Sequence, residues 1–405
     1  MKFNKWTVAL AATGVVSLAS VMQADESHPV NTALSSTTLS GYVDTSAIWN
    51  FGTGNTVAKR FVNTDSSRQD GFNLNSVKLQ LEKPIDEGTW SAGYKVETMF
   101  GPDAAALPGK VGTGVAIKQA YAALRAPVGN GIDFKIGQFD PIVGYEVTDS
   151  VANPNFSRSF GFNNLEPFGH TGILASYQVN EIIAVSAGVA NGDSTFDNKV
   201  SGLGGGLQGG SLTAGSSRGV FAESSKVYMG ALSVKAPESA GWLSGSTLFV
   251  GVVNGDRTGN KNDPTLLYTG VTLATPIEAL SIGASADLLF NANDGAAGKS
   301  YANALALYAG YKITDKLKLN NRLEYATSGN GSFLFVPPNA GANPARLAGG
   351  ADKVIGETVT LDYALWANVV TRAEFRWDHA ADGRGAFDNG AKNDLSLLAN
   401  VVYKF

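Results

Sequence analysis

Charged side chains alternate with apolar ones in several segments of the chain. In residues 369–378, "VVTRAEFRWD", single apolar residues separate the charges of Arg372, Glu374 and Arg376. A period of two puts these charges on one face of an extended strand. The pattern recurs elsewhere, and the charged residues of the predicted polar face are Lys78, Glu82, Lys95, Glu97, Lys135, Arg322, Glu324, Arg372, Glu374, Arg376 and Lys404. Seven of these residues are basic and four are acidic, so charges of both signs are present and this face could line a polar passage with little charge selectivity.

Residues suited to nucleophilic catalysis are few. The histidines are His28, His170 and His379, and Ser157 and Ser159 precede His170 by eleven to thirteen residues. A membrane-embedded lipase would need a serine, a histidine and an orienting polar group together, so this alternative stays open. No nucleophile-elbow pattern supports it. We therefore expect no catalytic residue and no enzymatic activity.

Motifs for metals and nucleotides fail their context tests. Asn-Gly-Asp occurs at 191–193 and 254–256, and oxygens of the second segment could suit calcium, but EF-hand spacing would place a glutamate where Leu267 stands. The G-x-G-x-x-G match at 204–209 follows no predicted strand and opens no helix. Cysteine is absent, which excludes thiolate ligands. We expect no metal site and no cofactor.

The composition favours β-structure and disfavours nucleic-acid binding. Of 405 residues, 48 are glycine and only 16% are charged, compared with about a quarter in soluble domains. The net charge is −4, and no basic run is present. A nucleic-acid partner would need a basic patch, so none is expected.

The first 24 residues have the anatomy of a secretory signal peptide. Lys2 and Lys5 precede an apolar stretch from residue 6 to about 18, and small residues follow. The stretch is shorter than the roughly 20 residues of a membrane-spanning helix. We predict cleavage after Ala24, with Ser20 as the second choice. The mature chain would begin at about Asp25 and carry a short periplasmic arm over residues 25–37.

The rest of the chain is dominated by strands of period two. We predict sixteen of them, starting near Thr38, Phe72, Gly88, Val115, Gly131, Thr171, Glu181, Lys226, Ser244, Thr265, Ala279, Tyr301, Leu317, Val354, Ala367 and Asp394. Seven short turns, rich in Pro, Gly, Asn and Asp, alternate with eight long loops. This alternation is typical of a transmembrane antiparallel β-barrel with short periplasmic turns and long external loops, here over residues 38–405. The alternative, a soluble β-sandwich or solenoid, would not sort its loops by length. A barrel of this size is wide enough for water, so we expect the charges of the polar face to be solvated.

The segment 137–172 carries a family resemblance. Its residues Gly137, Phe139, Gly144, Tyr145, Glu146, Ser157, Arg158, Ser159, Pro167, His170 and Gly172 resemble those of the outer-membrane β-barrel porins of the OmpL-like family, and Asn254 to Asn262 is similar to a loop of that family. A tryptophan expected after Asn254–Gly255 is Asp256 here. The resemblance implies a porin but no particular solute. In general sixteen-stranded porins, which the chain resembles in architecture, the third long loop narrows the barrel, so Glu146, Asp149, Arg158 and Glu166 could form a constriction or could be ordinary exposed loop charges.

We therefore predict a channel in the outer membrane of a Gram-negative-type bacterium for passive diffusion of small polar solutes and ions. A substrate-specific channel, for example for sugars, and a structural or adhesive barrel without an open pore remain alternatives. Only about thirteen residues of the predicted mature chain precede the first strand, so we expect no large N-terminal plug. The expected partners are outer-membrane lipids, small polar solutes and further copies in a homotrimer, the last by analogy alone.

The chain ends on an apolar strand pattern, "DLSLLANVVYKF". In the membrane an open sheet edge cannot persist, so this segment is expected to pair with the first strand. Its terminal aromatic, Phe405, resembles the signal by which the barrel-assembly machinery recognises outer-membrane proteins. We predict that Phe405 serves both barrel closure and this recognition.

Overall fold

The computed structural model describes residues 30–31, 37–51, 70–86, 90–107, 110–112, 114–191, 226–255, 264–291, 301–329, 351–385, 387 and 391–405. The predicted signal peptide, His28, the glycine motif at 204–209 and most of the two Asn-Gly-Asp loops lie outside these residues. Within the described part, no helix is long and apolar enough to cross a membrane.

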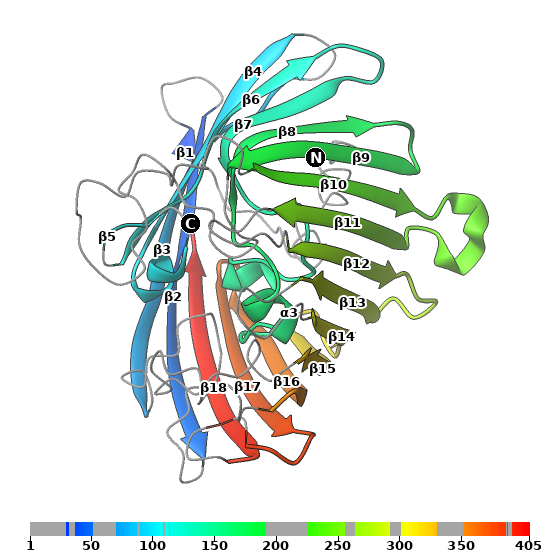
Figure 1. Ribbon diagram of the computed structural model, residues 1–405. Coiled ribbons are helices and arrows are strands. Elements are labelled where there is room, and N and C mark those ends of the chain that lie inside the picture. The colour runs from blue at the N-terminus through cyan, green and yellow to red at the C-terminus, as the bar shows by residue number, and fades with distance from the viewer. Residues whose placement is uncertain are drawn as a thin grey trace, which may run out of the picture.

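Sixteen long antiparallel strands form the wall of a closed barrel (Figure 1). Each begins within three residues of its predicted start, which confirms the predicted fold class and strand number. The strands are β2 (Thr38–Phe51), β3 (Gly71–Lys83), β4 (Ser91–Phe100), β6 (Val115–Ala126), β7 (Ile132–Phe139), β8 (His170–Gln178), β9 (Ile183–Asn191), β10 (Lys226–Lys235), β11 (Thr247–Gly255), β12 (Thr265–Leu273), β13 (Leu280–Phe290), β14 (Tyr301–Lys312), β15 (Leu317–Ser328), β16 (Lys353–Trp366), β17 (Val369–Ala380) and β18 (Asn393–Lys404).

The barrel closes between its last and first strands. β18 pairs with β2 from Leu395 opposite Phe51 to Lys404 opposite Tyr42. Two further backbone hydrogen bonds join Phe405 to Gly41. Closure leaves no edge to expose unpaired backbone groups to hydrocarbon. Two short fragments also join the sheet: β1 (Val30–Asn31) pairs with β2, and β5 (Lys110–Gly112) pairs with β6.

The outer face of the wall is apolar and the inner face is polar. On β18, Leu397 and Val401 are exposed, whereas Ser396 and Asn400 on the opposite face are buried. Three exposed tryptophans, Trp90, Trp242 and Trp366, lie at the short-turn end of the barrel, and Trp49 is exposed near the long-loop end of β2. This is the reverse of a soluble protein and is typical of a barrel that spans a bilayer between aromatic girdles.

The third long loop, residues 140–169, folds into the barrel instead of standing outside it (Figure 1). It contains the short helices η3 (Ser150–Ala152) and α3 (Phe160–Asn164). Its apolar residues Ile142, Val143 and Leu165 pack in one buried cluster with inward residues of β8 to β13, while Phe162 and Phe168 pack in another with Met99 on β4 and Ala116 on β6. The third loop therefore crosses the barrel interior.

Candidate functional site

Three arginines on the two strands that flank β16 hold the third loop from one side of the barrel. Arg322 lies on β15, and Arg372 and Arg376 lie on β17; alternation along each strand turns all three inward. We call them, together with the carboxylates of Glu146, Glu324, Asp362, Glu374 and Asp378, the arginine cluster. Its groups are nearly all fully buried.

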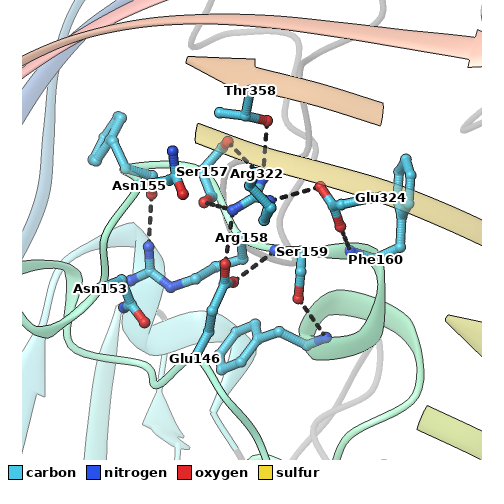
Figure 2. Close-up of polar contacts among 12 residues, drawn as sticks. Glu146, Asn153, Asn155, Ser157, Arg158, Ser159, Phe160, Arg322, Glu324 and Thr358 are labelled. Carbon is cyan, nitrogen blue, oxygen red and sulfur yellow. Dashed lines mark hydrogen bonds and ion pairs between the residues drawn. The ribbon is translucent and has the colours of Figure 1, made fainter. Parts of the chain in front are cut away.

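Arg322 is the centre of this cluster (Figure 2). Its Nη1 lies 2.7 Å from Oε1 of Glu146 in the third loop, and its Nε lies 2.7 Å from Oε2 of Glu324. Nη1 also donates to the Ser157 carbonyl, and Nη2 donates to the hydroxyls of Ser157 and Thr358. One guanidinium thus joins the third loop to β15 and β16 through several charge-assisted bonds.

The carboxylates of the wall bind backbone amides of the same loop segment. Glu374 accepts hydrogen bonds from the amides of Phe156 and Ser157 at 2.5 and 2.9 Å, and Glu324 accepts one from Phe160 at 2.6 Å (Figure 2 shows Glu324). Arg376 donates to the carbonyl of Arg158 at 2.7 Å. Side chains of the wall therefore supply hydrogen-bond partners for the backbone amides and carbonyls of residues 156–160. This irregular segment makes few backbone hydrogen bonds of its own.

A second group of charges fastens the loop to the wall at β3 and β6, on the other side of β18 and β2 from the arginine cluster. We call Lys78, Lys95, Lys118, Glu97, Asp140 and Asp149 the lysine cluster. Lys78 Nζ lies 2.8 Å from Asp149 Oδ2, and Lys118 Nζ lies 2.6 Å from Asp140 Oδ2. Burial alone would raise the pKa of Asp149, but Lys118 and Lys78 hold that pKa below its ordinary value. Asp149 is therefore an ionised tether of the third loop.

The expectation that the inward charges are solvated is wrong for the arginine cluster and for part of the lysine cluster. Arg322 and Arg376 are 0% exposed and Glu97 is 1% exposed, because the third loop covers them. Such burial is sustained because each charge has an opposite charge and further hydrogen bonds. The predicted inward residues that stay only half-buried are Glu82, Lys95, Lys135 and Lys404.

The four loop residues predicted for a constriction lie inside the barrel and are not ordinary exposed loop charges. Glu146 binds the wall at β15, and Asp149 binds it at β3, as described above. Arg158 instead turns into its own loop, where its guanidinium donates to the carbonyls of Val147, Thr148 and Phe156. It therefore shapes the loop and does not present its charge to the lumen.

Several charged residues of the site escaped the sequence reasoning. Asp362 follows the same alternation as the predicted residues, so the period-two pattern could have found it. Lys118 lies at a β-bulge, where the alternation of β6 shifts by one residue, and Asp140 belongs to an irregular segment without any periodicity. Its role depends on the position of Lys118, which only the folded loop defines.

The serines considered for catalysis are used to hold the loop. Ser157 Oγ accepts hydrogen bonds from Arg322 and Arg376, both at 3.2 Å. Ser159 caps α3 by accepting a hydrogen bond from the Phe162 amide at 3.1 Å. His170 is fully buried beside the ring of Phe139 at the start of β8. These contacts give both serines structural roles.

Glu166 and Asp287 form a buried pair of carboxyl groups. An oxygen of each lies within 4 Å of the position that a Cβ would take on Gly161, so the two groups lie close together on the same side of α3. Among the described residues neither has a basic side chain within salt-bridge distance. Burial raises the pKa of Glu166 well above its ordinary value, and the nearby carboxyls of Asp287 and Glu146 raise it further. Glu166 thus keeps its proton at pH values where a free glutamate is ionised.

We expect the third loop to loosen as the pH rises, and Glu166→Gln to remove part of this effect. The folded chain holds a proton that the unfolded chain loses near pH 4.5, so the fold loses stability from that pH upward until the raised pKa is passed. Glutamine is neutral throughout. Thermal unfolding of the detergent-solubilised barrel at several pH values would measure this, with Asp315→Asn in an exposed turn as the control. Parallel curves for the wild type and Glu166→Gln would contradict it.

A closed sixteen-stranded barrel with an apolar exterior, a charged interior and an inward-folded third loop is the architecture of an outer-membrane porin. Residues 36–405 match the family model described as "Putative beta-barrel porin-2, OmpL-like", and the chain belongs to this family. The resemblance seen in the sequence is thereby confirmed.

Solved structures of outer-membrane proteins share the fold. The outer membrane channel DcaP of Acinetobacter baumannii has a TM-score of 0.58 at 14% identity, over 91% of this chain and 97% of that one. OprB of Pseudomonas putida has a TM-score of 0.55 at 11% identity, over 91% and 93%. A trimer form of OmpT of Vibrio cholerae has a TM-score of 0.51 at 14% identity, over 91% and 99%. A comparison with curated protein sequences gives no match.

Proposed function

We propose that this porin is a water-filled channel through which small polar solutes and ions diffuse passively. The observation that carries the proposal is the third loop, which lies inside the closed barrel and is held there by ion pairs with β15, β3 and β6. Solutes would pass beside the half-buried charges that the loop leaves accessible, namely those of Glu82, Lys95, Lys135, Asp140 and Asp149. Because these charges are of both signs, the selectivity of the channel would be weak.

A substrate-specific channel is the second candidate, and two observations favour it. The third loop contacts both sides of the barrel, which narrows the passage. Some tyrosines also project inward, although most aromatic residues of the strands are exposed on the outer face: Tyr42 and Tyr308 are buried, and Tyr121 lies beneath Lys135 with the ammonium 5.2 Å from its ring centre. Aromatic faces along a channel suit sugar rings.

Planar-bilayer recording of the refolded protein tests the proposal. We expect stepwise openings whose size rises in proportion to salt concentration, with a reversal potential near zero in a salt gradient. Lys135→Glu should shift the reversal potential toward cation selectivity, because it reverses a half-buried charge with no carboxylate within salt-bridge distance among the described residues. Currents that one sugar blocks in a saturable way would instead support the specific channel. A sealed membrane at saturating protein would contradict both and favour a structural or adhesive barrel.

The remaining features of the proposal concern biogenesis and assembly. We infer that residues 1–24 are a cleaved signal peptide, which the N-terminal residue of the mature protein would test, and that the protein has no enzymatic activity. Outer-membrane lipids would surround the barrel, and the barrel-assembly machinery would insert it. A homotrimer is the proposed assembly.

A further inference from the structure

The lipid-facing surface of the wall carries one acidic side chain. On β16 the even-numbered Thr358 and Thr360 are fully buried inside the barrel, so Glu357 and Val359 lie on the outer face. Asn321 lies on the outer face of β15, because its neighbour Arg322 points inward. The Asn321 side-chain amide donates a hydrogen bond to Glu357. Among the described strands, all other acidic side chains face the interior.

This amide–carboxyl pair lies near the middle of the wall. Glu357 is directly opposite Leu323, the seventh of the twelve residues of β15, and Asn321 is the fifth. The surrounding outer face is apolar, since Leu323 and Leu361 are each 44% exposed and Phe375 is 43% exposed. The pair is therefore set within the belt that hydrocarbon would cover.

Lipid cannot satisfy this pair. Acyl chains offer no hydrogen-bond donor, and head groups lie at the rims of the barrel. A carboxyl group in that environment is costly whether ionised or neutral, since either form keeps polar atoms that one amide cannot satisfy. The outer faces of β9 to β11, in contrast, carry Val185, Leu232, Leu248 and Val252. The β15–β16 face therefore differs from an ordinary lipid face because it carries a polar pair. Such a pair would be satisfied by contact with the polar groups of another protein.

We propose that the outer face of β15 and β16, centred on Glu357 and Asn321, packs against a second copy of this chain. The pair is self-complementary: it holds a donor on one strand and an acceptor on the next. If copies are related by a rotation axis parallel to the barrel axis, β15 of one copy, which carries the donor, meets β16 of its neighbour, which carries the acceptor. Each Asn321 amide would then also serve the Glu357 carboxyl of the adjacent copy. This inference rests on the proposed oligomeric porin and identifies the face by which it assembles.

A second polar cluster extends the same face toward the long-loop end. Trp377 is directly opposite Glu357 on β17. Its indole donates to Asn393 Oδ1 at 3.0 Å, and His379 Nδ1 lies 2.8 Å from the same oxygen. Outward polar groups therefore continue from the centre of β16 to Asn393 at the start of β18, as expected of a surface that meets protein.

Cross-linking of single cysteines tests the interface, and the absence of native cysteine makes it unambiguous. Val359→Cys lies beside the pair on the outer face, and Val252→Cys on the outer face of β11 is the matched control, with β12 to β15 between it and β16. With a short bis-maleimide in native outer membranes, Val359→Cys should give covalent dimers of the chain, and Val252→Cys should stay monomeric. Adding Glu357→Leu to Val359→Cys should reduce the dimer several-fold, whereas Glu357→Gln should retain most of it.

The contrary results are equally distinct. If Glu357 faced lipid, Val359→Cys would not cross-link above the control, and Glu357→Leu would raise the melting temperature of the barrel by removing a polar group from hydrocarbon. Cross-linking that Glu357→Leu leaves unchanged would also overturn the role of the pair. Planar-bilayer conductance distinguishes failure of the interface from failure of the proposed channel. If the protein forms open channels but Val359→Cys does not cross-link, only the interface is refuted. If the wild-type protein leaves the membrane sealed, the proposed function is refuted.

Discussion

Arg322→Ala is expected to release the third loop and to increase single-channel conductance. The substitution removes the partner of Glu146 and Glu324 and leaves both carboxylates buried. Breaking a buried ion pair in this way costs about 3–5 kcal/mol, which exceeds the contribution of any single neutral hydrogen bond in the loop. Without this anchor the segment near residue 157 should leave the wall and widen the passage. Planar-bilayer conductance and protease cleavage within residues 140–169 would measure the change.

Two variants control for general destabilisation. Arg384→Ala removes an arginine whose side chain is 40% exposed and which binds Asp352 and Asp382 outside the barrel interior, so conductance should stay at the wild-type level. Arg322→Lys keeps the charge but loses the fork that reaches the glutamates and Ser157 together, and should give an intermediate result. If Arg322→Ala folds and conducts like the wild type, the arginine cluster does not hold the loop.

Deletion of Phe405 is expected to remove most of the folded barrel from the outer membrane. Phe405 exchanges two backbone hydrogen bonds with Gly41, of 2.8 and 3.0 Å, at the point where the barrel closes. Its ring lies against Gly41, where a Cβ would collide with it. The deletion therefore shortens the β18–β2 seam and removes the proposed recognition signal at once. The heat-modifiable folded band in outer-membrane fractions would measure assembly.

Phe405→Ala separates the two roles, because it keeps the backbone bonds and removes the ring. If the ring is read during insertion, Phe405→Ala should fail in cells as the deletion does, and both variants should still refold in detergent without assembly machinery. If the seam matters more, the deletion alone should fail, and it should fail in detergent as well. Normal assembly of both variants in cells would refute the prediction for Phe405.

The wall of the barrel could be predicted because its rules are local. A strand alternates its faces at every residue, and lipid on one side requires apolar residues at alternate positions. The alternation in the sequence of β18 is therefore enough to place Leu397 and Val401 on its outer face. The alternation of short turns and long loops then distinguished the two ends of the barrel.

The third loop could not be predicted in this way, because its contacts join residues far apart in the chain. Glu146 and Arg322 are separated by 176 positions, and Ser157 and Glu374 by 217. The loop has no periodicity, so nothing local shows that it lies within the barrel. The expectation of solvated inward charges failed for the same reason: the pattern placed Arg322 and Arg376 inside but carried no information on what covers them.

By itself the sequence determined the barrel, its strand number and the face to which each strand residue belongs, since covalent alternation and the hydrocarbon solvent suffice for those. Only the tertiary structure decided which charges are paired and buried. Pairing depends on distances of about 3 Å between groups that the chain brings together only once the barrel has closed around its third loop.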